Sequence, residues 1–282
     1  MFFKIASLSC FANQNPCYAP GTPSLKVYSM SFSSLLLLFA GGMLGGVINV
    51  MAGGAGFMTF PLLIAAGLTE MQANAANFVA LLPANVAGTA VYGKELRDVR
   101  EHLFTRIIIA VIGGTLGSLL LIWLGEASFH RAIPWLLLFA TLSFALGPTL
   151  KRWLERDAKF DTTRWLWLSF LLEFLVYVYG GYFGLGMGII LLAIHSIFSP
   201  MSVHHANALR NVTIAAMTLV SILIFARSGL IQWLPSLVMM AGAVVGGYGM
   251  AKLARRVPVD KVRLGILCWS ILLTAFSFWR YS

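Results

Sequence analysis

Long apolar stretches separated by short polar clusters make up most of this 282-residue sequence. Stretches of about 17 to 20 residues recur, which is the length that a helix needs to cross a hydrocarbon core of ~30 Å. The clearest of these stretches extend from Ser33 to Val50, from Thr105 to Leu124 and from Leu264 to Phe278. The sequence lacks the alternating ten-residue segments of a membrane barrel, and backbone groups in lipid must be bonded within their own segment. The pattern therefore predicts an all-α integral membrane protein.

The two halves of the chain open with the same order of features. In the first half, Gly53-Gly54-Ala55-Gly56 precedes a short apolar stretch, and in the second half Gly184-Leu185-Gly186-Met187-Gly188 does so. Each half is predicted as one helix, a glycine-rich break, a short helix and three full spans. The predicted helices cover 33–52, 55–67, 72–92, 104–124 and 132–150, then 165–183, 187–199, 206–226, 233–251 and 264–280.

Basic residues predict how these helices are oriented. Most of the 20 Lys and Arg residues lie in three predicted loops, at 93–106, 151–164 and 252–263. A short helix of ~20 Å does not cross the membrane alone. If the short helix and the helix before it together enter the membrane and return to the side they started from, all three loops lie on one face. The positive-inside rule requires this arrangement. Each half then makes an odd number of passes, so we expect two inverted-topology repeats with both termini outside.

This reading divides the chain into four parts. We expect a first membrane repeat at 31–150, a cytoplasmic linker at 151–164 and a second membrane repeat at 165–282. Residues 1–30 differ in kind, with several Asn, Gly and Pro close together. Lys4 before a short apolar stretch resembles a weak signal peptide. We expect instead a disordered extension, or an upstream start chosen in place of Met30.

Composition excludes several classes of protein. Hydrophobic residues make up 59% of the chain and charged residues 11%, against roughly 25% charged in a soluble domain. The net charge of +10 comes from residues at the ends of apolar spans, so it does not predict nucleic-acid binding. Cys10, Cys17 and Cys268 provide neither metal spacing nor a disulfide framework. No metal and no cofactor are expected.

Polar residues inside the predicted spans mark the candidate site, because such residues are costly unless they face protein or a water-filled cavity. They form one stripe on each of two corresponding helices, and the glycine breaks add the free N–H groups at the N-termini of the short helices. Amide and guanidinium groups are suited to oxyanions. The predicted substrate-binding residues are Gly54, Gly56, Asn74, Asn77, Gly186, Gly188, Asn207, Arg210 and Asn211.

Structural roles compete with these assignments. Asn and Thr in membrane helices often bond neighbouring helices, and Arg210 can snorkel to the interface from the end of its helix. Glu173 is the exceptional acid within the spans; it either pairs with an Arg or carries protons. His195, His204 and His205 lack carboxylate or Cys companions for a metal, and the last two are expected at the inner mouth.

Glycine pairs and tryptophans have simpler interpretations. The pairs Gly113/Gly117 and Gly242/Gly246 recur in corresponding spans and predict close helix packing. Most of the eight tryptophans lie near span ends, where they anchor helices at the interface.

Inverted repeats with glycine-broken helices are typical of transporters, whose substrate site lies where the breaks meet near the midplane. Because acids are nearly absent from the spans, we expect a small anionic solute. A channel and a non-transporting membrane scaffold remain alternatives. An intramembrane enzyme would need a nucleophile–base or metal constellation, and the sequence has no HExxH, no GxSxG and no paired acids, so no enzyme is expected. Small-residue faces leave a homo-oligomer open.

The same motifs resemble those of the TauE/SafE sulfite-exporter family. The resemblance covers about residues 31–282 and rests on the ordered motifs of both halves, Gly53–Phe57 with Ala73–Asn77 and Gly184–Gly188 with Ala206–Asn211. It implies a permease in the cell membrane that exports or takes up sulfite, sulfonates or related organosulfur anions. Met187, Ala193 and Arg210 depart from the family pattern, so the second break is expected to be less open than the first.

Overall fold

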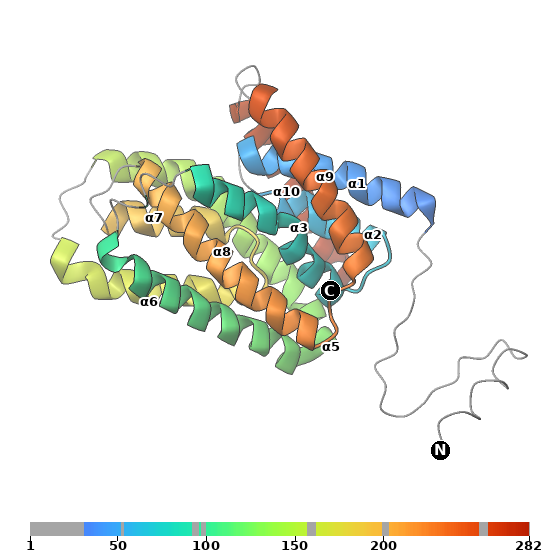
Figure 1. Cartoon of the computed structure of the whole chain (residues 1–282), viewed down its shortest axis with the longest axis horizontal. Coiled ribbons are helices and arrows are strands. Elements are labelled where there is room, and N and C mark those ends of the chain that lie inside the picture. The colour runs from blue at the N-terminus through green and yellow to red at the C-terminus, as the bar shows by residue number, and fades with distance from the viewer. Residues whose placement is uncertain are drawn as a thin grey trace, which may run out of the picture.

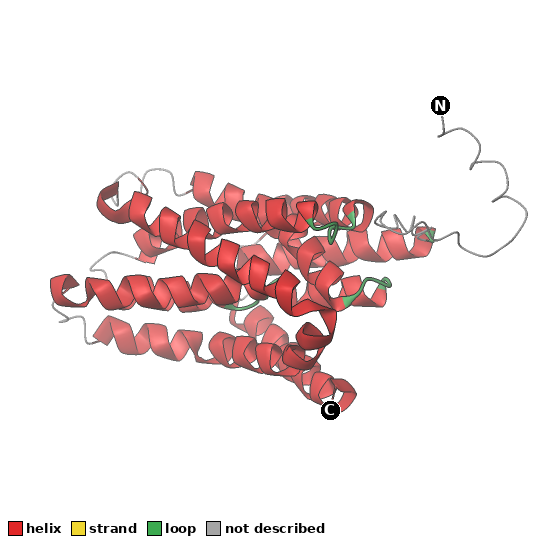
Figure 2. Ribbon diagram, turned by 90° about the horizontal axis from the view of Figure 1, so that it is seen from below, coloured by secondary structure: helices red, strands yellow, loops and turns green. Residues whose placement is uncertain are grey.

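The computed structural model describes residues 31–51, 54–91, 96, 100–156, 162–198, 203–253 and 259–281. In this part of the chain all regular structure is helical, as Figure 2 shows. The helices labelled in Figure 1 are α1 (Phe32–Met51), α2 (Gly56–Ala65), α3 (Glu70–Val91), α5 (Arg100–Arg156), α6 (Thr162–Tyr182), α7 (Met187–Phe198), α8 (Val203–Arg227), α9 (Trp233–Leu253) and α10 (Val259–Tyr281). The predicted extension at 1–30, Gly53 and parts of the three basic loops lie outside the described residues, and for His204 only the backbone is described.

The predicted helices are confirmed to within a few residues, with one consistent error at the charged ends. The predicted linker at 151–164 is helical up to Arg156 and again from Thr162, and α10 begins at Val259 rather than 264. The prediction ended each helix where apolar residues ended. Lys, Arg, Glu and Leu are good helix formers, so a helix continues past the hydrocarbon boundary.

Helix α5 contains a turn where two separate spans were predicted. Gly125 has φ 72° and ψ 177°, which breaks the helix, whereas the residues on both sides are helical. The predicted gap at 125–131 is therefore reduced to one residue. We call the part before Gly125 the first arm of α5 and the part after it the second arm. The apolar stretch Leu103–Gly147 has 45 residues, about 67 Å of helix and enough for two crossings.

By length and composition, four of the described helices can cross a membrane. Their apolar stretches are Phe32–Asn49, Leu103–Gly147, His205–Arg227 and Lys261–Arg280. Shorter apolar helices lie at Gly56–Ala65, Leu166–Tyr182 and Trp233–Tyr248. Large apolar side chains also cover much of the surface; Trp167, for example, is 86% exposed and Trp123 is 81% exposed. Such a surface is suited to lipid rather than water.

Two seams of glycine hold the bundle together. On α9, Gly242 and Gly246 face the backbone of α1, and a Cβ on Gly246 would lie only 2.6 Å from the carbonyl carbon of Met43. On the first arm of α5, Gly113 and Gly117 face α6 in the same way, with a Cβ on Gly113 only 2.7 Å from Tyr177 Cβ. The predicted close packing of both glycine pairs is confirmed. Backbones approach this closely only where both helices present small residues.

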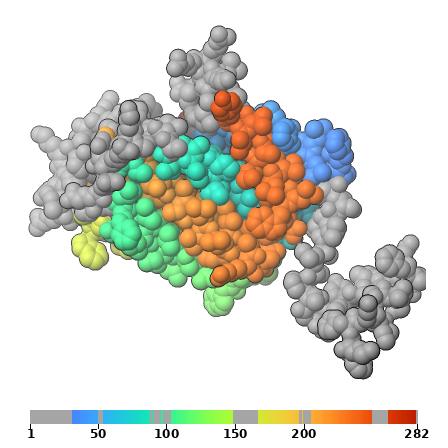
Figure 3. All heavy atoms as spheres, in the orientation of Figure 1, coloured from blue at the N-terminus to red at the C-terminus, as the bar shows by residue number. Residues whose placement is uncertain are grey.

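Helices α3 and α8 lie between these two seams. Helix α8 packs against the first arm of α5 and against α3, which in turn packs against α9. Figure 3 shows this order on one face, from the green first arm of α5 through orange α8 and teal α3 toward α9. Buried aromatic and aliphatic residues fill the space behind them, including Phe78 of α3 and Phe225 of α8, whose rings lie 5.5 Å apart. The two short helices α2 and α7 begin in this core.

Candidate functional site

The chain reverses direction sharply before each short helix. Before α2, Gly54 has φ 81°, and before α7 both Gly184 and Gly186 have φ near 80°. Residues with a Cβ rarely adopt this left-handed conformation, so glycine is required at these three positions. We call residues 54–56 the first tip and residues 184–188 the second tip.

The two tips touch each other inside the bundle. A Cβ on Gly56 would lie 3.0 Å from Leu185 Cγ, so the first tip packs directly on the second. The ring of Phe60 on α2 meets that of Phe183, next to the second tip, edge to face at 5.5 Å. The predicted approach of the two glycine-rich tips is confirmed.

The second arm of α5 supports both tips from behind. Phe144 packs on the first tip, where its ring lies 5.8 Å from that of Phe57, and Ala140 packs on Gly186 of the second tip. Two hydrogen bonds add to this support. Trp269 Nε1 on α10 donates to the Phe57 carbonyl at 3.0 Å, and the Tyr179 hydroxyl donates to the Leu185 carbonyl at 2.6 Å.

Asn77 lies beside the first tip. Its Oδ1 accepts a hydrogen bond from Thr59 Oγ1 at 2.5 Å, which orients the amide. The Nδ2 atom lies 3.2 Å from the position that a Cβ on Gly56 would take. The donor side of this amide is therefore next to the first turn of α2, where the helix carries partial positive charge.

Arg210 has the corresponding place beside the second tip. Its Cδ and Nη1 atoms lie 3.8 and 3.9 Å from the position of a Cβ on Gly188, in the first turn of α7. Its Nη2 donates to Asn211 Oδ1 at 3.2 Å, and Asn211 is buried. The guanidinium thus packs against the first turn of α7.

The other two asparagines are placed differently. Asn74 is fully buried, and its Nδ2 donates to the Tyr182 carbonyl at the end of α6, at 3.0 Å. This bond joins two helices, as in the structural alternative, while Asn74 Oδ1 has no hydrogen-bond partner among the described residues. Asn207 on α8 is half-buried. The structure therefore brings Asn77, Arg210 and Asn211 to the tips most directly.

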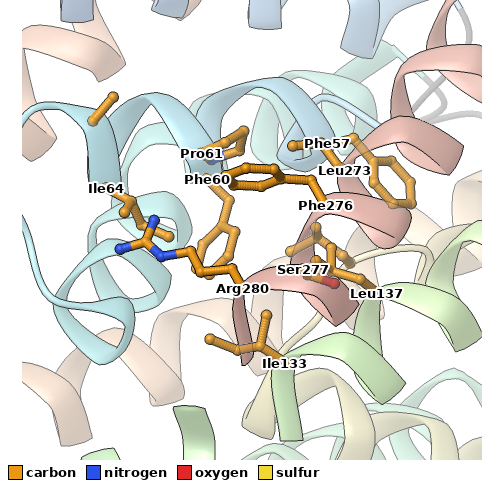
Figure 4. Close-up of a pocket in the computed structure, with 12 residues that line it drawn as sticks. Phe57, Phe60, Pro61, Ile64, Ile133, Leu137, Leu273, Phe276, Ser277 and Arg280 are labelled. Carbon is orange, nitrogen blue, oxygen red and sulfur yellow. The ribbon is translucent and has the colours of Figure 1, made fainter. Parts of the chain in front are cut away.

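A cavity of about 300 Å³ opens beside the first tip. Helices α2, α5 and α10 form its walls with mostly aromatic and aliphatic side chains, and Leu185 of the second tip also lines it. Figure 4 shows Phe276 and Arg280 reaching from α10 across the cavity toward α2. Its volume is at the lower end of the range for small-molecule sites. Residues at both tips, Phe57 and Leu185, therefore line a chamber that the Arg280 side chain also lines.

A buried ionic cluster confirms the pairing of Glu173 with an Arg, although sequence reasoning did not identify which Arg. Arg106 was predicted in a basic loop, but only 2% of it is exposed, and its Nη1 donates to Glu173 Oε1. Ser169 Oγ donates to the same oxygen at 2.8 Å, and His195 Nε2 lies 3.6 Å from it. Glu173 as a lone acid in an apolar span was the available signal. Its partner could not be found because Arg106 is distant in sequence and adjoins other basic residues.

A second carboxylate cluster lies at the Gly125 turn. Glu126 Oε1 accepts from the Met71 backbone N–H at 3.1 Å, and Oε2 accepts from Thr69 Oγ1 at 2.9 Å. The carboxylate thereby caps the start of α3, a favourable place for negative charge. His130 Nδ1 lies 3.2 Å from Glu70 Oε1. Among the described residues, no three His, Cys, Asp or Glu side chains are grouped to hold a metal ion.

Comparisons with known proteins agree with this architecture. Residues 38–277 match the family described as "Sulfite exporter TauE/SafE". A "Probable membrane transporter protein" of Haemophilus influenzae is 26% identical over 245 residues, which cover 86% of this chain and 93% of that protein. The "Probable membrane transporter protein YfcA" of Escherichia coli K12 is 27% identical over 233 residues, 81% of this chain and 83% of that protein.

A third relative, the "Probable membrane transporter protein ORF9" of Sinorhizobium sp, is 24% identical over 231 residues, which cover 80% of this chain and 87% of that protein. No solved structure gives a significant match. Because the family match extends over most of the helical bundle, the resemblance inferred from the glycine and asparagine motifs is confirmed. The chain belongs to the TauE/SafE sulfite exporter family of membrane transporters.

Proposed function

We propose that this transporter carries a small sulfur-containing anion, such as sulfite or a sulfonate, through a site between its two tips by alternating access. The observation that carries this proposal is the matched placement of Asn77 at the first tip and Arg210 at the second. Each side chain lies against the first turn of a short helix, where backbone N–H groups and the helix dipole favour an anion. A permanently charged guanidinium inside a membrane protein marks a functional site by default.

The proposal includes an inverted repeat of residues 31–150 and 165–282. Two contacts at opposite ends of the first arm of α5 support it. Thr69, just after α2, bonds to Glu126, whereas His195 on α7 lies beside Glu173 and its partner Arg106. The helix from Arg106 to Leu124, just before the Gly125 turn, has 19 residues and spans about 28 Å, close to the thickness of the hydrocarbon core. The short helices would then end on opposite sides of the membrane.

The glycine seams support the same arrangement. The first helix of each half packs on a glycine pair of the other half, α1 on α9 and α6 on α5. This reciprocity is expected when two repeats are related by a pseudo-twofold axis. With the basic loops in the cytoplasm, both termini are outside, and α2 ends toward the outside. The cavity beside α2 would then be the outer vestibule of the site.

The test is uptake of labelled sulfite, taurine, sulfoacetate and thiosulfate into proteoliposomes that contain the purified protein. Saturable uptake of at least one anion supports the proposal, and no saturable flux across the panel refutes transport of this substrate class. Asn77→Ala and Arg210→Gln test the site. Thr59 Oγ1 is also 3.1 Å from the Ala55 carbonyl, so it keeps an acceptor in Asn77→Ala and the fold should persist. Each variant should lose most uptake while eluting as a folded monodisperse protein, and unchanged uptake in both contradicts this placement.

A further inference from the structure

The buried cluster of Arg106, Ser169, Glu173 and His195 has no part in the anion site, although it joins three helices. Arg106 comes from the first arm of α5, Ser169 and Glu173 come from α6, and His195 comes from the short helix α7. Glu173 and His195 are both completely buried. From Gly188 at the second tip to His195 is seven residues of helix, about 10 Å. A movement of α7 would therefore change the cluster and the tip together.

Hydrogen bonding within this cluster is incomplete. Glu173 Oε1 accepts from both Arg106 and Ser169, whereas the buried Oε2 has no hydrogen-bond partner among the described residues. Neither ring nitrogen of His195 has one in that part of the chain, and its Nε2 is 3.6 Å from Glu173 Oε1, beyond hydrogen-bond length. Buried polar atoms without partners are rare and cost free energy. Here they leave room for one more proton between the ring and the carboxylate.

The charges show what such a proton does. Arg106 offsets the charge of Glu173, so the cluster is neutral while His195 is neutral. Adding a proton to His195 Nε2 makes an imidazolium, and the cluster then carries one positive charge. The carboxylate attracts this charge but is already paired, so burial of the extra charge is only partly compensated. Proton binding thus weakens the closed packing of α7 on α5 and α6.

Other titratable groups lie on α6 and on α8, which packs against all three helices of the cluster. Tyr177 lies one turn after Glu173 on α6, and its buried hydroxyl is close to Thr213 of α8. Phe170 stacks on Arg106 with 5.2 Å between the guanidinium and the ring centre. On α8, His205 lies in the first two turns and Arg210 packs at the second tip. Phenols and guanidiniums keep their protonation state near neutral pH, whereas an imidazole can gain a proton there.

We propose that His195, facing Glu173, is the binding site for a proton that is carried with the anion and controls the release of α7. The part of this inference that concerns carrying the proton rests on the proposed transport function. The proton comes from water on the side to which α7 opens, adds to the neutral ring and leaves when the ring meets water on the other side. The added positive charge makes the loaded protein more favourable for an anion at the second tip.

Hydrogen exchange of α7 tests the proton site without any transport assay. In wild-type protein in nanodiscs, protection of the amides in 187–198, corrected for the intrinsic pH dependence of exchange, should fall about tenfold between pH 8.0 and 5.5, which brackets the usual histidine pKa of ~6.5. The fall should disappear in His195→Gln and in His195→Asn, two neutral replacements of which either one suffices. The pH-dependent fall in protection should remain in His205→Gln and in His130→Gln, control variants that each remove a histidine outside the cluster. A pH-independent wild-type protein, or a His195 variant that keeps the wild-type response, overturns the proposal.

Coupling is then measured in proteoliposomes with a pH-sensitive dye inside. Inward anion flux should bring in protons in wild-type protein, and the number of protons per anion should fall in His195→Gln. Anion flux without proton movement, together with flat exchange, overturns the proton site and leaves the proposed transport function standing. Absence of any anion flux refutes the proposed function instead, while the exchange experiment still decides whether His195 controls α7.

Discussion

Replacing Gly246 with alanine tests whether the close approach of α1 and α9 holds the bundle together. A Cβ at this position would overlap the Met43 carbonyl oxygen and lie 2.6 Å from the carbonyl carbon and from Cα of Met43. All three atoms belong to the backbone of α1, so no side-chain rotation can make room. Carbon atoms in contact prefer about 3.5–4.0 Å, so the two helices must separate by roughly 1 Å.

The structure allows the cost of this separation to be judged. Overpacking a well-packed contact typically costs about 1–3 kcal/mol, and rigid backbone at the contact places Gly246→Ala toward the upper end. A gap of 0.5–1 Å also forfeits about a quarter to a half of each neighbouring dispersion contact along the seam. At ~2 °C per kcal/mol for a protein of this size, the melting temperature should fall by roughly 5 °C.

The assay is thermal unfolding of the purified protein in detergent, with Gly265→Ala on α10 as the matched control. A Cβ on Gly265 meets no atom within 4 Å, so this substitution adds only helix propensity. Because it stabilises the helix by at most ~1 kcal/mol, it should leave the melting temperature unchanged or raise it. Equal melting temperatures for Gly246→Ala and Gly265→Ala would refute the packing argument.

Two further predictions concern the supports of the first tip and of α3. Trp269→Phe removes the hydrogen bond to the Phe57 carbonyl, and the loss of ~1 kcal/mol should appear as faster hydrogen exchange in α2, whereas the exposed Trp167→Phe should leave α2 unchanged. Glu126→Gln weakens the charged cap on Met71 and Thr69, so the start of α3 should exchange faster while α9 does not. Unaltered exchange in α2 or in α3, respectively, would contradict each argument.

Local signals in the sequence predicted most of the helices and the glycine contacts. Apolar length located each span, and glycine clusters located both tips, because only glycine adopts the backbone conformation at Gly54 and Gly186. The spacing of Gly242 and Gly246 predicted a close helix contact without naming the partner. Which helix fills such a groove depends on the whole bundle, so α1 became visible only in the structure.

The contacts that the sequence did not predict join residues far apart in the chain. Arg106 lies near other basic residues and was therefore counted with the loop residues that orient the helices in the membrane, although it is buried against Glu173. Trp269 was expected as an interface anchor, and its indole also bonds the Phe57 carbonyl. For Asn74, a stripe pattern could not distinguish a ligand from a helix-joining hydrogen bond. Pairwise contacts of this kind depend on packing between helices, which local composition does not determine.

Counterflow in proteoliposomes tests the central claim, a carrier with one anion site between the two tips, most directly. Vesicles loaded with millimolar unlabelled anion, from whichever member of the panel shows flux, are diluted into a trace of the labelled anion. The account predicts transient accumulation of label above its equilibrium level in wild-type protein, and its loss in Arg210→Gln. Through a channel, the labelled anion reaches its equilibrium level without accumulating above it. Equilibration without overshoot, or an overshoot that Arg210→Gln leaves unchanged, would contradict a carrier with one anion site between the tips.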